Sequence, residues 1–323
     1  MTFESSTPLI EYRNYKASDY ESYAVFCKEN FGKNNYQLNR SYLEWLYSDN
    51  SNSFSVAVSE NLIIGVIHNF KAPLLINKQP TIVTVLHDLM VDDKYRGGAG
   101  FHLMQSGLKS DKYVVLPGST DRLSRAYGRL GSKEFNSFWY RKFQIPKSFF
   151  TLRKLKGLSN YQDLAKKQDI LFGHNKEESS QFLTRALKKY NNIECFSSYF
   201  KWRFLNKNAP LTFYVSDNNG ENTVLFVIGK RGLLPYARIF YVHSDNELIF
   251  NNIMQFIEKI TAKIGIPIIL YTTFECPPTA KLKYKIYAEI PISYVYSKNK
   301  NYDFIPKVPS FCSDIGFDGL NPF

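Results

Sequence analysis

The stretch VDDKYRGGAGFHLM, residues Val91 to Met104, decides how the first half of this chain folds. It follows an apolar run, TIVTVLHDLMV, which is rich in β-branched residues and typical of a buried strand. The residues after the glycines are typical of a helix. An arginine and three glycines therefore stand between a strand and a helix. Such a connection either holds phosphates or is a tight turn that is rich in glycine.

The connection has the physical properties of an anion site. A loop that leaves a strand and opens a helix presents unpaired backbone N–H groups in one direction, together with the positive end of the helix dipole. Glycine lets phosphate oxygens approach the backbone, which a Cβ would block. Arg96 adds a planar guanidinium that is always charged. These properties favour phosphate binding, and a glycine-rich turn without a ligand is the alternative.

The composition is that of a globular protein with an excess of cations. The 323 residues carry a formal net charge of +12, and the lysines and arginines are spread through the chain. This spread argues against nucleic acid as a partner and suits a small molecule that bears phosphates. The five histidines are isolated, and no His/Cys/Asp group has the spacing of metal ligands, so no metal is expected.

Membrane and secretion signals are not expected either. The longest apolar runs have the length of strands and cannot span a bilayer. The first residues lack the apolar segment of a signal peptide, and the four cysteines are far apart, which indicates reduced thiols. These features predict a cytoplasmic location and no membrane span.

The chain repeats one pattern of elements. The sequence SYLEW, which ends at Trp45, returns as SYFKW, which ends at Trp202, and this recurrence favours a packing role for both tryptophans. Each half continues with three apolar strands, a helix, a buried strand and a short helix. An aromatic strand then closes each half, FWYRKF at 138–143 and ISYVYSK at 292–298. The repeat predicts one domain at 1–145, a connecting segment at 146–187 and a second domain at 188–323.

The first half reads as an α/β domain with a mixed sheet. Alternation and β-branched runs predict strands at 9–15, 54–59, 62–70, 82–91 and 113–117. Apolar periodicity and terminal signals predict helices at 18–31, 39–47, 99–110 and 122–130. Glu60 and Asn61 form a plausible hairpin turn, and Gly131 is placed to end the last helix.

This order of elements, the loop YRGGAG and the helix SRAYGRLG together resemble the GNAT superfamily of acyl-CoA-dependent N-acyltransferases. The resemblance covers residues 9–143. The second half follows the same pattern, but HSDNELIF replaces its glycine loop, so it resembles a degenerate copy. The implied fold is α/β, with two tandem GNAT-like domains, each a mixed, mostly antiparallel sheet flanked by helices. The sequence is also similar in style to acyltransferases of bacterial surface-sugar biosynthesis.

The resemblance implies acetyl-CoA or another acyl-CoA as co-substrate, and no metal. In the superfamily a loop of pattern R/Q-x-x-G-x-G/A binds the CoA pyrophosphate, and YRGGAG fits this pattern with one residue deleted. The strand before the loop splays from its neighbour, and its main chain pairs with the pantetheine arm. The implied CoA-binding residues are Leu89, Met90 and Val91 on that strand and Tyr95, Arg96, Gly97, Gly98, Ala99, Gly100 and Phe101 in the loop.

Three residues are candidates for the chemistry. Tyr127 matches the superfamily tyrosine that commonly protonates the leaving thiolate, four residues before Gly131. A core aromatic is the alternative. His87 or Asp88 is the candidate base for the amine. Because they are neighbours on a strand, they are expected to point to opposite faces, so that only one faces the cleft. Either can equally be a core polar residue.

The sequence therefore predicts an acyl-CoA-dependent N-acyltransferase whose partners are an acyl-CoA and a small amine. An amino sugar linked to a nucleotide suits the positive charge. Two alternatives stay open. One is an aminoacyl transferase similar to the Fem family, which pairs two GNAT-like domains and uses charged tRNA. The other is a GNAT-like binding module without catalytic activity.

Overall fold

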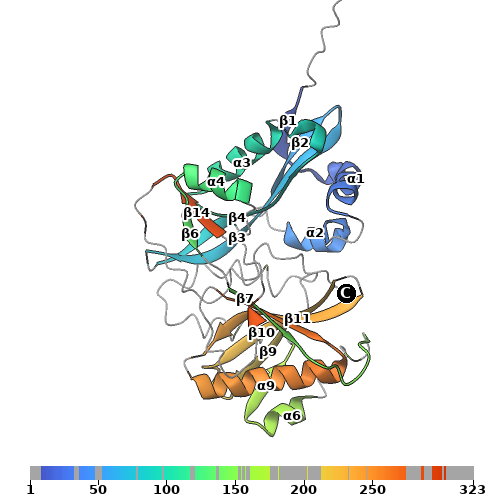
Figure 1. Cartoon of the computed structure of the whole chain (residues 1–323), viewed down its shortest axis with the longest axis vertical. Coiled ribbons are helices and arrows are strands. Elements are labelled where there is room, and N and C mark those ends of the chain that lie inside the picture. The colour runs from blue at the N-terminus through green and yellow to red at the C-terminus, as the bar shows by residue number, and fades with distance from the viewer. Residues whose placement is uncertain are drawn as a thin grey trace, which may run out of the picture.

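The computed structural model describes residues 9–32, 36–47, 53–77, 79–96, 98–116, 121–135, 138–151, 154, 157, 161–174, 181, 202, 212–231, 233–244, 246–273, 285–286, 293–299 and 302. Within these ranges the chain forms two seven-stranded sheets with helices packed against them (Figure 1). Each sheet is mixed and mostly antiparallel, as the sequence predicted. None of the described helices is long and apolar enough to span a membrane.

The first sheet is antiparallel except where β4 and β5 run parallel. Its strand order is β1 (Glu11–Asn14), β2 (Phe54–Ser59), β3 (Leu62–Ile76), β4 (Gln79–Val91), β5 (Tyr113–Leu116), β14 (Ser293–Ser297) and β6 (Lys133–Phe135). The helices of this half are η1 (Ala17–Asp19), α1 (Tyr20–Asn30), η2 (Tyr36–Leu38), α2 (Arg40–Leu46), η3 (Asp93–Tyr95), α3 (Ala99–Lys109) and α4 (Asp121–Arg129).

The second sheet has the same plan, with one parallel pair between β11 and β12. Its order is β13 (Lys285–Ile286), β7 (Phe138–Phe143), β12 (Ile268–Thr273), β11 (Leu234–His243), β10 (Thr223–Arg231), β9 (Thr212–Asp217) and β8 (Ile170–Gly173). The long helix α9 (Glu247–Ile264) covers its lower face in Figure 1, and α6 (Gln162–Lys166) lies beside β8. The buried face of α9 supplies much of this core, including Phe250, Ile253 and Ile257.

The last strand of each half lies in the sheet of the other half. β7 pairs with β12, with Tyr140 opposite Tyr271. β14 lies between β5 and β6, with Tyr294 opposite Leu116 (Figure 1). The prediction that 138–143 and 292–298 close their own halves is therefore wrong. Alternation fixes which residues of a strand face the core, but not which strand it pairs with. The division into domains at residues 145 and 188 stays a prediction.

Two tryptophans join the halves. Trp45 and Trp202 are both buried, and their rings stack with centroids 5.3 Å apart and an interplanar angle of 2°. Each indole Nε1–H donates to the backbone carbonyl of the other residue, at 3.1 Å and 3.0 Å. This reciprocal contact confirms the packing role that their recurrence in the sequence favoured.

Each face of the first sheet has its own core. On one face α1, which contributes Tyr23, and α2 pack over sheet residues such as Phe54 and Val66. On the other, α3 and α4 pack over a second cluster that includes Leu86, Leu103 and Tyr127 (Figure 1). The turn predictions are also confirmed: Glu60 and Asn61 have φ values of 51° and 64°, as a tight two-residue hairpin turn requires, and Gly131 ends α4 at φ 75°.

Candidate active site

A β-bulge interrupts β4 at the predicted site. Val66 on β3 lies opposite Met90, and His68 lies opposite His87. One residue of β3 therefore stands against two of β4, Asp88 and Leu89. Asp88 has φ 50°, a left-handed conformation that aspartate adopts more readily than most residues. Bulges of this kind re-aim a side chain.

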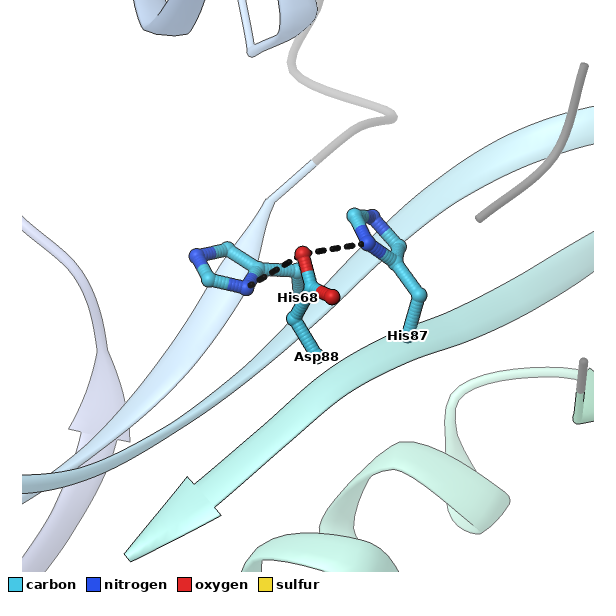
Figure 2. A group of neighbouring side chains, drawn as sticks. All are labelled: His68, His87 and Asp88. Atoms are coloured by element: carbon cyan, nitrogen blue, oxygen red, sulfur yellow. Dashed lines mark hydrogen bonds and ion pairs between the residues drawn. The ribbon is translucent and has the colours of Figure 1, made fainter. Parts of the chain in front are cut away.

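The bulge brings His87 and Asp88 to the same face of the sheet. His87 Nδ1 lies 3.1 Å from Asp88 Oδ2 (Figure 2). The prediction that these neighbours point to opposite faces is wrong, because strict alternation along a strand fails at a bulge. Both candidate residues therefore belong to one cluster, and neither excludes the other.

The cluster also contains His68, which the sequence did not single out. The imidazoles of His68 and His87 stack with centroids 5.4 Å apart, and His68 Nδ1 lies 3.9 Å from Asp88 Oδ2 (Figure 2). Gln37 on η2 donates from Nε2 to the same oxygen at 3.1 Å. The expectation that the histidines are isolated is therefore wrong for this pair.

The three residues have the donor set of a metal site. One ligand atom from each of His68, His87 and Asp88 lies within 4.8 Å of the others. Two imidazoles and a carboxylate are ligands that first-row divalent ions accept. This ligand set has no recognisable spacing in the sequence, because His68 comes from a different strand.

His68 is fully buried and electrically neutral. Its Nε2 lies 2.9 Å from the hydroxyl of Tyr23, on α1, and aromatic rings of Tyr23, Tyr47 and Phe54 surround it. Burial lowers the pKa of His68 to about 3, although the Asp88 carboxylate acts in the opposite direction. His68 is therefore a neutral member of the cluster beside the Asp88 carboxylate.

β4 and β5 pair over a short length only. Within the described residues, Thr84 pairs with Val114 and Val85 with Val115, whereas β4 continues to Val91. The splay that the resemblance implies from Leu86 onward stays a prediction. Among the predicted main-chain contacts, Leu89 and Val91 pack toward the α3 side of the sheet and Met90 toward the α1 side.

The N-terminus of α3 lies directly after this strand and η3. Gly98 is its N-cap residue, no side chain of the described residues caps it, and its first turn has no acidic residue. The amides of Phe101 and His102 donate to the Gly98 carbonyl, at 3.0 Å and 3.2 Å. The N–H groups of Gly98, Ala99 and Gly100 precede these helical bonds, at the positive end of the helix dipole.

The other predicted loop residues surround this terminus. Arg96 is exposed and forms an ion pair with Asp93, three residues earlier. Tyr95 packs partly against the α3 core, Ala99 is buried, and Phe101 is 54% exposed. Gly97 lies outside the described residues. The loop therefore has backbone amides and the exposed guanidinium of Arg96 available to an anion from solvent.

Tyr127 lies on the other face of the first sheet from His87 and Asp88. It is buried on α4, and its ring contacts that of Tyr294 with centroids 5.5 Å apart. Tyr294 belongs to the exchanged strand β14. Burial raises the pKa of Tyr127 to about 12, so its phenol keeps its proton at neutral pH. The structure therefore places the candidate acid and the candidate base on opposite faces of the sheet.

The fold matches solved structures of N-acyltransferases. One is a GCN5-related N-acetyltransferase from Kribbella flavida, with TM-score 0.56 and 11% identity over 90% of this chain and 72% of that chain. A probable N-acyltransferase of unknown function from Enterococcus faecalis V583 gives TM-score 0.57 and 9% identity over 90% and 73%. A GCN5-related glucosamine N-acetyltransferase region of a fungal multi-domain GH3 β-N-acetylglucosaminidase gives 0.55 and 13% over 90% and 38%.

No protein-family model matches the sequence, and no curated protein does. At these identities the structural matches show the fold. The chain therefore has the fold of the GCN5-related N-acetyltransferases, the GNAT fold, across both of its halves.

Proposed function

We propose that the protein is an acyl-CoA-dependent N-acyltransferase that transfers an acyl group to a small amine, with the reaction in the first half. The observation that carries this proposal is the N-terminus of α3. It has a glycine N-cap, no cap from a described side chain and no acidic residue in its first turn. It follows a strand that leaves its parallel neighbour after Val85.

The helix terminus and the strand accommodate two parts of coenzyme A, its pyrophosphate and its pantetheine arm. The amides of Gly98, Ala99 and Gly100 and the guanidinium of Arg96 bind the pyrophosphate. The backbone of Leu89 to Val91 pairs with the pantetheine arm and polarises the thioester carbonyl. Acetyl-CoA is the simplest donor of this kind, and the site's chemistry needs no metal.

The transfer is a nucleophilic substitution at the thioester carbon. His87 and Asp88 remove a proton from the acceptor ammonium, and the neutral nitrogen attacks the carbonyl carbon. The N–C bond forms as the C–S bond breaks. Tyr127, on the opposite face of the sheet from this base, then gives its proton to the departing thiolate where β4 extends beyond its pairing with β5, a role that its protonated state supports.

For the acceptor we propose an amino sugar linked to a nucleotide, used in surface-polysaccharide synthesis in the cytoplasm. The net charge of +12 suits a substrate with phosphates. A structural neighbour is itself a glucosamine N-acetyltransferase region. Charged transfer RNA, which a Fem-like enzyme uses, is the competing acyl donor in place of acyl-CoA and is separated by experiment.

The test combines binding with turnover. We expect CoA and acetyl-CoA to raise the melting temperature progressively as ligand increases. Thiol release from acyl-CoA with nucleotide-linked amino sugars and other small amines then identifies the acceptor. Deacylation of aminoacyl-tRNA in the presence of an amine would instead indicate the Fem-like reaction. A melting temperature that does not respond to millimolar CoA or acetyl-CoA would indicate a binding module that has lost its cofactor.

The substitution Tyr127→Phe tests the proposed role of Tyr127 as the general acid. We expect kcat to fall about 100-fold, the usual contribution of a positioned acid, while CoA affinity stays within about twofold. Tyr296→Phe is the control, because it removes a hydroxyl from a residue packed against the same core. Unchanged turnover in Tyr127→Phe would leave Tyr127 with a packing role only.

A further inference from the structure

We propose that Tyr23 and His68 are positioning residues, which orient Asp88 so that it holds His87 with its proton on Nδ1 and its lone pair on Nε2. This inference depends on the proposed function for the reaction that His87 serves. The arrangement of protons that it predicts can be measured in the resting protein, without any substrate.

The first step is the contact between Tyr23 and His68. His68 is neutral, so it carries one N–H. Its Nδ1 faces the Asp88 carboxylate and its Nε2 faces the Tyr23 hydroxyl at 2.9 Å. A carboxylate only accepts, so the proton is favoured on Nδ1, and the Tyr23 hydroxyl donates to Nε2. Tyr23 thereby fixes the orientation and tautomer of a ring that has no contact with solvent.

The second step is the orientation of Asp88. Its Oδ2 accepts from Gln37 Nε2 and from His87 Nδ1, each at 3.1 Å, and His68 Nδ1 lies 3.9 Å away. The left-handed backbone at Asp88 is strained and is retained only where the surroundings compensate for it. The donors from η2 and β4 provide this compensation, and the neutral imidazole of His68 on β3 packs beside the carboxylate.

The third step concerns His87 itself. Because Nδ1 donates to Asp88, Nε2 carries the lone pair that accepts a proton from the amine. The titratable groups that face His87 within the described structure are Asp88 on its own strand and His68 on β3. Tyr23 on α1 acts behind His68. When His87 gains a proton, the adjacent carboxylate stabilises the imidazolium, as in other Asp–His pairs.

A divalent ion held by the same three residues is the competing interpretation, and two contacts disfavour it. Gln37 directs an N–H toward Asp88 Oδ2, the oxygen that an ion would need. His87 Nδ1 lies at hydrogen-bond distance from that oxygen, which indicates a proton between them. The metal site is therefore an outcome of the test.

The experiment is long-range ¹H–¹⁵N NMR of the imidazoles in the full chain, labelled on histidine and treated with a chelator. At pH 8 we expect both His68 and His87 as the Nδ1–H tautomer. Tyr23→Phe keeps the ring and removes the hydroxyl, so His68 should become a mixture of tautomers. Asp88→Asn should do the same to His87. Tyr20→Phe, on the same helix, is the matched control and should change neither ring.

Kinetics supply the second readout. We expect Tyr23→Phe to lower kcat about tenfold without a change in the KM for acyl-CoA, and to move the acid limb of the kcat/KM profile. A His87 that is mainly the Nε2–H tautomer would overturn the proposal, and so would a Tyr23→Phe protein with wild-type spectra and rates. Histidine signals that move when a stoichiometric metal is chelated would assign a metal site instead. The expected tautomers without thiol release would support the positioning and refute the proposed function.

Discussion

The two halves share an order of elements but differ at the helix that follows their third strand. In the second half, Asn246 Oδ1 accepts from the amides of Leu248 and Ile249, at 3.0 Å and 3.2 Å, and Glu247 occupies the first turn of α9. At α3, no described side chain caps the terminus, and Gly98 stands where Asn246 does. The second half thus satisfies two of its helix amides with its own side chain, whereas the amides at the start of α3 have no side-chain cap among the described residues.

The sheets differ in a matching way. Both carry a bulge in the strand before the helix, β4 in the first half and β11 in the second. β11 nevertheless stays paired with β12 through four residues, from Tyr236 to Ile239, while β4 pairs with β5 at two. In both halves the described parallel pairs lie before the bulge, and the first half has two fewer of them.

Among the described residues, a cluster of histidines with a carboxylate occurs in the first half only. Near the equivalent position of the second hairpin, Ile228 lies opposite Ala237 and Gly229 opposite Tyr236. A Cβ on Gly229 would lie 2.9 Å from the Tyr236 ring, so that aromatic side chain occupies the space beside the strand. The comparison supports a second half that keeps the fold as a packing partner while the first half carries the chemistry.

The two halves are not independent, because β7 and β14 each lie in the sheet of the other half. Disrupting one of these exchanged strands should have the largest effect on stability and on CoA binding. Val295 on β14 is fully buried and pairs with Val115 and with Lys133 of the first sheet. Val295→Asp places a charge in this buried position. We expect the free energy of unfolding to fall by more than about 3 kcal/mol, and we expect CoA binding to be lost as well. Urea unfolding and the CoA-dependent melting shift measure both.

Lys298→Asp is the control for the added negative charge, because Lys298 is exposed just beyond the same strand. It should leave both measurements nearly unchanged. A Val295→Asp protein that retained the wild-type response to CoA would show that the first half folds and functions without the strand from the second.

Capping α3 as α9 is capped should give the next largest effect. A Cβ at Gly98 would meet no atom of the described chain within 4 Å, so a side chain fits without rearrangement. We expect Gly98→Asp to weaken CoA binding about 100-fold through repulsion of the pyrophosphate, with unchanged or slightly higher stability. Gly98→Asn, which has the same shape without the charge, should weaken binding about tenfold. Calorimetric titration distinguishes the two.

Most of the first half could be predicted because its signals are local. β-branched runs gave β2 to β5, and Gly131 gave the end of α4. The partners of β7 and β14 could not be predicted, because two aromatic strands of similar length satisfy either sheet equally well.

The site was partly predictable for a similar reason. His87, Asp88 and the loop follow from one motif, but Asp88 reaches His87 only through a bulge, which alternation does not reveal. One signal for His68 was present. β3 ends at Ile76 and β4 begins at Gln79, and His68 and His87 each lie nine residues from the two-residue connection. An uninterrupted hairpin register places them opposite each other. Gln37 and Tyr23 carry no such signal, because tertiary packing brings them to the cluster.

Removing the arginine of the loop should have a moderate effect. Arg96 is exposed and paired with Asp93 across one turn, so solvent and this partner screen its charge. We expect Arg96→Ala to weaken CoA binding three- to tenfold, with a smaller difference at high salt. Arg129→Ala, an exposed arginine at the end of α4, should bind CoA normally. Equal affinities for the two variants would leave the backbone amides as the whole anion site.

The smallest effect should come from removing the cap of the second half. Asn246→Ala deletes the side chain that accepts from Leu248 and Ile249 and should cost about 1 kcal/mol of unfolding free energy, whereas Asn246→Gly should cost a few tenths. Neither should change the CoA-dependent melting shift, because Glu247 repels an anion even from an uncapped α9. A reduced shift in Asn246→Ala would mean that the terminus of α9 contributes to CoA binding, and the functional difference between the halves would then be one of degree.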